Sequence, residues 1–410
     1  MTESAKPLKT LILLGDGMAD FPIPELGGKT PLMAAHTPAM DRLAREGRTG
    51  LFLTVEDDLP PGSEIANLTV LGYDPRAVYQ GRGVLEAASL GVTLAPDDVA
   101  MRVNLICIEN GRIKSHSAGH ISTEEAHALI QELQTHLANW PLRLTPGLSY
   151  RHLLVMPGAD PRLACAPPHD HVGEAVADLL VKPLVPEAAA TADLLNRLIA
   201  ASQEFLAAHP LNVARSAAGQ QPANALWPWS PGRRPRMATF QERFGVRGAV
   251  ITAVDLIKGL GIYAGMDVLP VEGATGLYDT NYEGKADAAL AALDAYDLVY
   301  VHVEAPDEAG HARDLALKIR CIEDLDRWLM QRLLDGLGPR LEETIVAVLP
   351  DHPTPVATGS HVHGAVPVAI RDPRHAPDAV LRYDEESVKA GALGLLRGAD
   401  FIERVVMRRS

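Results

Sequence analysis

The sequence predicts an α/β fold in which a doubly wound, mostly parallel sheet carries a second α/β domain inserted into it. Short, apolar, β-branched runs alternate with helical patterns near both ends of the chain, which is typical of a sheet covered on both faces. The middle of the chain has a different texture and is bracketed by proline-rich segments. A length of 410 residues, with 47% hydrophobic and 22% charged residues, suits two or three globular domains.

The first strand is predicted at residues 11–14, a purely apolar run that ends in a Gly-Asp-Gly turn. Such a run is typical of a buried parallel strand followed by a loop. A helix is expected next, with Thr37 as its N-cap and Pro38 at its first position. The same helix is expected to stop at Gly47.

The pattern recurs beyond the middle of the chain. Residues 298–303 and 344–349 are apolar, β-branched runs, and a loop follows each of them. A long helical stretch near residues 314–334 separates the two runs. Strands that alternate with helices in this way indicate a largely parallel sheet with helices on both faces.

The central region is predicted to form the inserted domain. It contains two strand candidates, at residues 101–108 and 152–156. One helix is expected to begin at Ser122, with Glu125 completing a capping box, and another is expected at residues 188–209. Proline-rich segments lie at residues 157–168 and 227–232. We therefore expect a core domain formed by residues 1–84 and 226–410 and an inserted domain formed by residues 85–225.

The charge of the chain narrows the classes of partner. Lys and Arg number 38 against 52 Asp and Glu, which gives a net charge of −14. This balance argues against nucleic acid and against an anionic membrane as partners. The polar start of the chain lacks the apolar core of a signal peptide. The three cysteines are widely spaced, as in proteins of a reducing compartment. We therefore expect a cytoplasmic protein. The sequence does not decide whether the protein forms a homo-oligomer.

Acidic residues and histidines follow three of the predicted strands. Asp16 follows the first strand, Asp307 and His311 follow the second, and Asp351 and His352 follow the third. Ligands of open α/β sheets lie at the carboxyl ends of the strands, so these side chains are expected to meet there. Carboxylates mixed with imidazoles suit Mn²⁺ or Zn²⁺ better than Ca²⁺. His361 lies nine residues beyond His352, with His363 close behind it.

Ser63 is a candidate nucleophile. It follows a Pro-Pro-Gly turn and precedes an apolar helical pattern, so it could also be a helix N-cap. Ala66 occupies the position where a capping box would need Glu or Gln. At the N-terminus of a helix, free amides and the helix dipole favour an arriving phosphoryl group. A serine hydroxyl is a weak nucleophile, and metal coordination would activate it.

These motifs, in this order, resemble those of the archaeal-type cofactor-independent phosphoglycerate mutases of the alkaline phosphatase superfamily. The resemblance is carried by the sequences around Asp16, Ser63, Asp307 and Asp351 and by further segments at 81–87, 116–120 and 273–282. It implies an alkaline-phosphatase-like core that binds metal and an inserted domain that binds and covers substrate. The family usually has an Asp-Pro pair after its last histidine ligand, whereas this chain continues His361-Val-His-Gly-Ala.

The resemblance implies two divalent metal ions and no 2,3-bisphosphoglycerate. One ion would be bound by Asp307, His311 and His361, with His363 as the alternative to His361. The other would be bound by Asp16, Asp351, His352 and the oxygen of Ser63. Mn²⁺ is the first choice, and Zn²⁺, Co²⁺ and Mg²⁺ remain alternatives.

The activity implied is the interconversion of 2-phosphoglycerate and 3-phosphoglycerate through a phosphoserine at Ser63. Arg102, His116, Arg151 and Lys285 are candidates for binding the anionic substrate, because guanidinium and ammonium groups suit carboxylate and phosphate. Two alternative activities are a phosphotransferase acting on another hydroxyl, in the manner of a homoserine kinase, and a metal-dependent phosphatase. No P-loop or kinase glycine-rich loop is present, so ATP would have to bind in an unfamiliar way.

Overall fold

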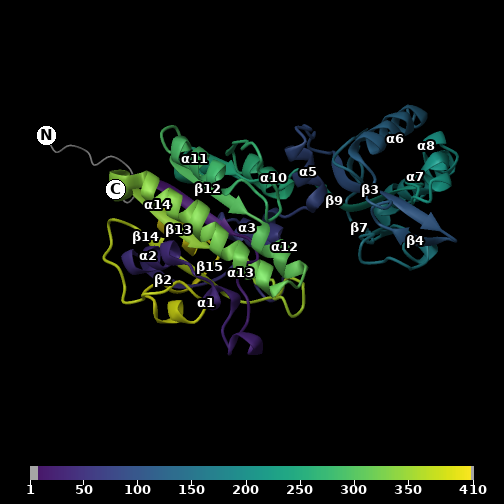
Figure 1. Cartoon of the computed structure of the whole chain (residues 1–410). Helices are drawn as coiled ribbons and strands as arrows, with labels where there is room; N and C mark the ends of the chain where they lie inside the picture. Colours follow the sequence, from purple (N-terminus) through teal and green to yellow (C-terminus); the bar gives the residue numbers. More distant parts are fainter. Residues whose placement is uncertain (1–7, 408–410) are drawn as a thin grey trace. The chain divides into compact units, whose positions relative to one another are not determined.

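The computed structural model describes residues 8–407 (Figure 1). The chain forms two compact units, of which the first comprises the chain up to Tyr79 and from Met237 onward and the second comprises Gln80–Arg236. Residues 1–7, which belong to the polar start of the sequence, lie outside the described part. None of the helices in residues 8–407 combines the length and the apolar character needed to cross a membrane.

The first unit is built on an eight-stranded sheet with the strand order β11-β10-β12-β1-β13-β14-β2-β15. Every strand runs in the same direction except β14, which is antiparallel to both of its neighbours. The sheet is therefore mostly parallel, as predicted. The strands are β1 Lys9–Gly15, β2 Arg48–Leu53, β10 Gly248–Ile251, β11 Asp267–Val268, β12 Leu298–Val303, β13 Thr344–Leu349, β14 Val366–Arg371 and β15 Gly394–Arg397.

Strands β12, β1 and β13 lie side by side at the centre of this sheet. Gly15 pairs with Val303 of β12, and Leu14 pairs with Leu349 of β13, so the three strands end at the same level. All three are buried along almost their whole length, which explains their near-continuous apolar sequences. Their carboxyl ends place the residues that follow each strand at one edge of the sheet.

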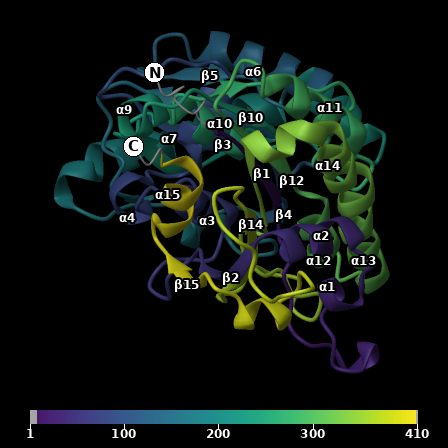
Figure 2. The ribbon, with the colours of Figure 1, turned by 90° about the vertical axis from the view of Figure 1, so that its left-hand side faces the viewer.

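Helices cover both faces of this sheet. Figure 2 shows α13 and α14 on one side of β1 and β12 and α15 on the other. Helices α2, α11 and α14 share one apolar core with β1, β12 and β13. The helices are α1 Pro31–Ala34, α2 Pro38–Glu46, α3 Ser63–Val70, α4 Pro75–Val78, α9 Phe240–Phe244, α10 Asp255–Tyr263, α11 Tyr282–Ala292, α12 Ala305–His311, α13 Leu315–Asp324, α14 Gln331–Leu337 and α15 Asp400–Val406, with a π-helical turn at Leu325–Met330 and 3₁₀ turns at Pro24–Leu26, Gly338–Glu343 and Ser387–Ala390.

The start of α2 differs in one detail from its prediction. The helix begins at Pro38 after Thr37, as expected, but the Thr37 side chain does not cap it. The buried carboxylate of Asp326, in the π-helical turn, accepts hydrogen bonds from the Ala39 N–H (3.1 Å) and the Met40 N–H (2.7 Å) instead. A side chain distant in the sequence thus replaces the local cap, and no local pattern could have predicted it.

The second unit contains an antiparallel sheet with the strand order β4-β3-β6-β5. A fifth strand, β9, pairs with β3 in addition. Helices α6 and α7 cover one face through the apolar side chains of β3 and β6. The elements are α5 Arg82–Ser89, β3 Val99–Glu109, β4 Arg112–Ser115, α6 Thr123–His136, β5 Arg143–Thr145, β6 Arg151–Met156, β7 Leu163–Ala164, β8 Lys182–Pro183, α7 Ala189–Ala207, α8 Pro210–Ala217 and β9 Ala225–Arg233, with 3₁₀ turns at Val176–Asp178 and Pro186–Ala188.

The limits of the units differ from the predicted domain boundaries at 84/85 and 225/226. Helix α5 packs against β3 and β9, so it belongs to the second unit from its first residue. The run 227–232, predicted as a proline-rich bracket, is part of strand β9, which pairs with β3 from Val99 to Ile106. Within the described sheet β9 pairs only with β3, and proline, which lacks an N–H, is tolerated in such an edge strand.

Candidate metal centre and anion pocket

Three acidic residues meet where β1, β12 and β13 end. Asp16 directly follows β1, Asp351 lies two residues after β13, and Asp307 lies in the short helix α12 that follows β12. All three side chains are buried. The adjacency of the strands thus brings together residues that are far apart in the sequence, at the sheet edge where the sequence analysis expected them.

The first ligand cluster consists of Asp307, His311 and His361. The His311 Nε2 atom lies 3.1 Å from Asp307 Oδ2, and the His361 Nε2 atom lies 3.4 Å from Asp307 Oδ1. The two Nε2 atoms are 3.0 Å apart, and one possible ligand atom from each of the three residues lies within 4.8 Å of the other two. His363 points elsewhere, because its Nε2 atom contacts the Leu59 carbonyl at 2.8 Å.

The electrostatics of this cluster follow from its contacts. Burial alone would raise the pKa of Asp307, but hydrogen bonds from His311 and His361 outweigh it and lower that pKa well below its ordinary value. The Asp307 carboxylate in turn raises the pKa of His311 to about 9. A carboxylate that faces two converging imidazole nitrogens is a donor set that suits a divalent cation.

The second ligand cluster surrounds His352. Its Nε2 atom lies 3.1 Å from Ser63 Oγ, 3.5 Å from Asp16 Oδ1 and 3.5 Å from Asp351 Oδ2. Burial lowers the pKa of His352, so the ring is neutral at ordinary pH. A neutral imidazole, two carboxylates and a hydroxyl are a second donor set that fits a divalent cation.

Asp16 supplies the strongest indication that a cation belongs in this cluster. Its Oδ1 atom is buried and has no hydrogen-bond partner. Burial, followed by the nearby carboxylates of Asp351 and Asp307, raises the pKa of Asp16 well above its ordinary value. Carboxylates that are buried this close together repel one another unless a positive charge lies between them. A divalent cation bound by Asp16 Oδ1 would supply that charge.

Ser63 begins α3 but is not its N-cap. The N-cap of α3 is Gly62, and Ser63 is the first residue of the helix. The residue is only partly buried. The hydroxyl therefore stands at the positive end of the helix, within contact distance of His352, where an anionic phosphoryl group would be attracted.

His302 is a residue of the site that the sequence analysis missed. Its Nε2 atom lies 3.0 Å from Asp16 Oδ2, and its Nδ1 atom lies 3.3 Å from Thr252 Oγ1. Burial, followed by the Lys285 charge, lowers the pKa of His302 to about 3, so a neutral ring donates to Asp16. A histidine inside a buried, apolar strand that ends at the site was a signal that could have revealed it.

Two further buried hydroxyls near the site were also missed, one in contact with a proposed ligand residue and one with Asn67. Thr354 Oγ1 donates to Asp307 Oδ1, and Tyr300 OH donates to Asn67 Oδ1. Burial, with contributions from Asp351 and Asp16, raises the pKa of Tyr300 well above its ordinary value, which keeps the phenol protonated. Tyr300 and His302 alternate with valines along β12, and this spacing places both on the same face of the sheet.

A pocket in the second unit contains three of the four residues predicted to bind substrate. Arg102, His116 and Arg151 line a cavity of about 260 Å³. Five further residues, none of them among the predicted substrate-binding residues, complete the lining: Arg82, Asn104, Tyr150, His169 and Trp229. Most of them come from other elements than Arg102, whereas Asn104 follows Arg102 by two residues on the same strand, β3.

The charges in this pocket favour an anionic ligand. The Arg102 guanidinium lies 5.0 Å above the Trp229 ring and forms an ion pair of 3.0 Å with Glu86. Burial lowers the pKa of Arg102, and burial, followed by His120 and Arg102, lowers the pKa of His116. The Arg102 Nε atom is buried without a hydrogen-bond partner.

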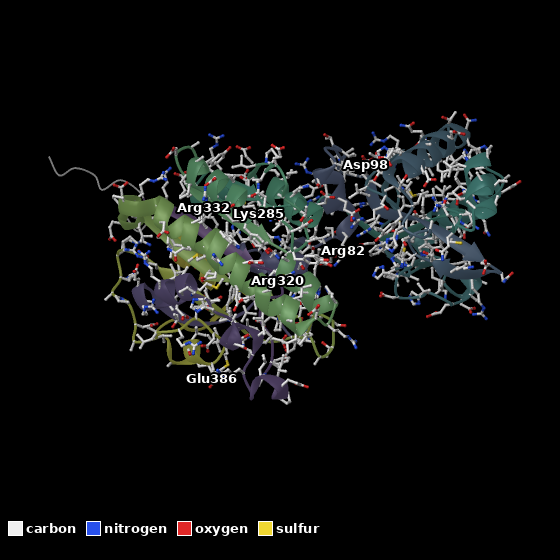
Figure 3. All side chains as sticks on the ribbon, in the orientation of Figure 1. Arg82, Asp98, Lys285, Arg320, Arg332 and Glu386 are labelled. Atoms are coloured by element: carbon white, nitrogen blue, oxygen red, sulfur yellow. The ribbon has the colours of Figure 1, made fainter. Side chains whose placement is uncertain are left out.

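Lys285, the fourth predicted substrate-binding residue, is in the first unit on α11 (Figure 3). Its side chain is buried, and its Nζ atom donates to the His302 carbonyl at 3.2 Å. Burial lowers the pKa of Lys285 to about 8, although Glu304 opposes this effect. Lys285 therefore supports the strand that carries His302, in addition to any contact with substrate.

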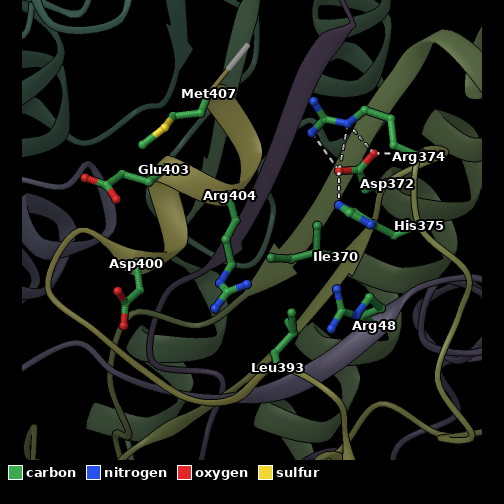
Figure 4. Close-up of a pocket in the computed structure, with 10 residues that line it drawn as sticks. All are labelled: Arg48, Ile370, Asp372, Arg374, His375, Leu393, Asp400, Glu403, Arg404 and Met407. Atoms are coloured by element: carbon green, nitrogen blue, oxygen red, sulfur yellow. Dashed lines mark hydrogen bonds and ion pairs between the residues drawn. The ribbon is translucent and has the colours of Figure 1, made fainter. Parts of the chain in front are cut away.

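A cavity of about 390 Å³ lies at the other edge of the first unit's sheet (Figure 4). It is lined by residues at the start of β2 and after the end of β14, such as Arg48 and Asp372. Asp372 is already bound by Arg374, with N–O distances of 2.9 and 2.7 Å. The lining contains none of the predicted ligands, so we assign no catalytic role to this cavity.

The chain is similar over nearly its whole length to proteins of one family. A family model described as 2,3-bisphosphoglycerate-independent phosphoglycerate mutase matches residues 44–212. The protein of that name from Methanosarcina acetivorans is 50% identical over 402 residues, which cover 97% of this chain and 100% of that protein. A probable 2,3-bisphosphoglycerate-independent phosphoglycerate mutase from Geobacter sulfurreducens is 46% identical over 406 residues, covering 98% of this chain and 100% of the relative.

Solved structures agree with this similarity. A protein from Pyrococcus horikoshii has a TM-score of 0.83 and 32% identity, and the match covers 97% of this chain and 96% of that one. A cofactor-independent phosphoglycerate mutase from Thermoplasma acidophilum has a TM-score of 0.68 and 26% identity, with 97% and 98% of the two chains covered. The resemblance found in the sequence motifs is thus confirmed, and the chain belongs to the family of 2,3-bisphosphoglycerate-independent phosphoglycerate mutases.

Proposed function

We propose that the protein interconverts 2-phosphoglycerate and 3-phosphoglycerate by transferring the phosphoryl group to Ser63 and back. The observation that carries this proposal is the hydroxyl of the partly buried Ser63, which lies 3.1 Å from His352 Nε2. The same nitrogen lies 3.5 Å from the unpartnered Asp16 Oδ1 atom. Family membership supports the choice of substrate, because the relatives of this chain are named for this reaction.

We assign two divalent cations to the two ligand clusters. Asp307, His311 and His361 would bind one, and Asp16, Asp351, His352 and Ser63 Oγ would bind the other. Mn²⁺ is the proposed ion, since both donor sets mix carboxylates with imidazoles. When bound, the cations stabilise negative charge on the reacting oxygens and lower the pKa of the serine hydroxyl.

The reaction needs two transfers at Ser63. The Ser63 hydroxyl gives up its proton as its oxygen attacks the phosphorus of the substrate, the bond to the glycerate oxygen breaks, and that oxygen takes up a proton. The other glycerate hydroxyl then attacks the phosphoserine, its proton is released, and the Ser63 oxygen leaves and is reprotonated. Atoms and protons balance over the cycle, so no second substrate is consumed.

The inserted unit would bind the glycerate and keep water away. Arg102, Arg151 and His116 share a pocket of about 260 Å³, and two guanidinium groups in one pocket suit a carboxylate or a phosphate. We propose that Lys285 contributes a further positive charge from the core domain. Holding the glycerate during its reorientation is essential, because water would otherwise cleave the phosphoserine and release free phosphate.

Three assays of the purified, Mn²⁺-loaded protein test the proposal. We expect conversion of 3-phosphoglycerate to 2-phosphoglycerate without added 2,3-bisphosphoglycerate and without release of phosphate. Formation of ADP from ATP and homoserine, with no turnover of phosphoglycerate, would favour the kinase alternative. Free phosphate as the main product would favour the phosphatase alternative, and either result would overturn the proposed activity.

A further inference from the structure

The side chain of Asn67 connects the nucleophile to one of the metal ligands. Asn67 lies on α3, one turn after Ser63, and is completely buried. Its Nδ2 atom donates to the Ser63 carbonyl at 2.8 Å and to Asp351 Oδ2 at 2.9 Å. Both acceptors are oxygens without a proton, so they require the nitrogen of the amide, and not its oxygen, on that side.

Tyr300 completes the hydrogen bonding of this amide. The Tyr300 hydroxyl donates to Asn67 Oδ1, and the Tyr300 side chain is only 1% exposed. Without that hydroxyl the Asn67 oxygen would be a buried acceptor with no partner among the described residues. An acceptor left unpaired in this way costs about 1–3 kcal/mol, enough to make the amide turn or shift toward another partner.

The two oxygens of Asp351 are held unequally. Oδ1 accepts hydrogen bonds from two backbone amides, Gly17 N at 3.1 Å and His352 N at 2.9 Å. Oδ2, the oxygen that faces His352 Nε2 at 3.5 Å, accepts from the Asn67 side chain. The direction of the ligand oxygen therefore depends on the orientation of the Asn67 amide.

We propose that Tyr300, acting through Asn67, is a positioning residue that fixes Asp351 Oδ2 and the first turn of α3 for the cation bound by Asp16, Asp351, His352 and Ser63. The catalytic consequence of this inference rests on the proposed function, whereas the expected effect of Tyr300 on metal binding does not. Neither Tyr300 nor Asn67 forms a hydrogen bond with Asp307, His311 or His361 in the described part of the chain. The effect of Tyr300 should therefore be confined to one of the two metal sites.

Tyr300→Phe tests the proposal, because it removes the hydroxyl and keeps the ring. Two single-site backgrounds separate the cations: His311→Gln disables the Asp307 cluster, and Asp351→Asn disables the His352 cluster. Mn²⁺ binding to each is measured by calorimetric titration. We expect Tyr300→Phe to weaken Mn²⁺ binding about tenfold or more in the His311→Gln background and to leave it unchanged in the Asp351→Asn background.

Tyr383→Phe is the matched control. Tyr383 is also buried in the first unit, and its hydroxyl donates to the Pro367 carbonyl at 2.9 Å and lies 3.4 Å from the Val348 carbonyl, neither of which belongs to a proposed ligand residue. Both variants lose one buried hydrogen bond, so their melting temperatures should fall by similar amounts. Only Tyr300→Phe should change Mn²⁺ binding, and in the otherwise wild-type enzyme it should lower kcat with little change in KM.

Two results would overturn the inference. One is unchanged Mn²⁺ binding on adding Tyr300→Phe to His311→Gln, and the other is an equal loss in both backgrounds, which indicates general destabilisation. The titrations contain no phosphoglycerate. If the wild-type protein fails to interconvert phosphoglycerates while the site-selective loss of Mn²⁺ remains, the proposed function falls and the role of Tyr300 stands.

Discussion

The Thr354 hydroxyl joins the two ligand clusters, because Oγ1 donates to Asp307 Oδ1 and lies 3.2 Å from His352 Nδ1. The Asp307 carboxylate can only accept, so the hydroxyl proton points to it and His352 Nδ1 carries the hydrogen that reaches Thr354. The lone pair of His352 is then on Nε2, the atom nearest Ser63 Oγ. One threonine thereby selects the tautomer that metal binding requires.

Thr354→Val should lower kcat about tenfold or more, because it frees both Asp307 and His352 from this contact while preserving the volume of the side chain. Thr354→Ser keeps the hydroxyl and should retain most of the activity. Steady-state kinetics at saturating Mn²⁺ measure the effect. Equal activity of the valine and serine variants would show that the contact is dispensable.

Arg151→Gln should raise KM for 3-phosphoglycerate about tenfold to a hundredfold and change kcat little. Arg151 lines the pocket of the inserted unit, and a charge-assisted hydrogen bond contributes about 1.5–3 kcal/mol. The control is Arg162→Gln, which removes an exposed arginine that is paired with Asp160 and does not line the pocket. A similar KM for both variants would remove Arg151 from the substrate site.

The inserted unit should lose stability in acid through His152. Burial, followed by a smaller effect of His127, lowers the pKa of His152 to about 3, against about 6.5 in the unfolded chain. The unfolded state therefore binds the proton first as the pH falls below about 6.5, and the folded state is disfavoured down to about pH 3. Between pH 7 and pH 5 this one residue removes about 2 kcal/mol of stability.

His152→Asn tests this expectation, because the asparagine oxygen can accept the Gly147 N–H that His152 Nδ1 accepts at 3.0 Å. The measurement is the free energy of urea unfolding at pH 7 and at pH 5 for both proteins. We expect the loss between the two pH values to be smaller in the variant than in the wild type. The same loss in both would show that His152 also titrates normally in the folded chain.

The strands of the core could be predicted closely from the sequence. Residues 298–303 and 344–349 coincide with β12 and β13, because strands buried on both faces are uninterrupted apolar runs. Strand β9 was missed, since its two prolines are typical of a loop, and an edge position in the sheet is a tertiary feature. The contact of Asp326 with the start of α2 is likewise a tertiary feature, which no local pattern in the sequence shows.

The site could be predicted only where function leaves a chemical pattern in the sequence. Aspartates and histidines that follow strands, such as Asp16 and Asp351, stand out because charged side chains are costly beside apolar runs. Thr354 and Asn67 are ordinary in composition, and their contacts with Asp307 and Asp351 arise only when the strand ends meet. The choice of His361 over His363 likewise depends on the path of the loop, which brings His361 to Asp307.

The most direct test of the account is a search for phosphate on Ser63 during turnover. The Mn²⁺-loaded protein is mixed with 3-phosphoglycerate, quenched in acid and analysed by peptide mass spectrometry, alongside Ser63→Ala. We predict phosphate on the Ser63 peptide of the wild type, none on the variant, and a loss of activity on the order of 10³-fold or more in the variant. An unmodified Ser63 peptide together with full activity of Ser63→Ala would contradict the account.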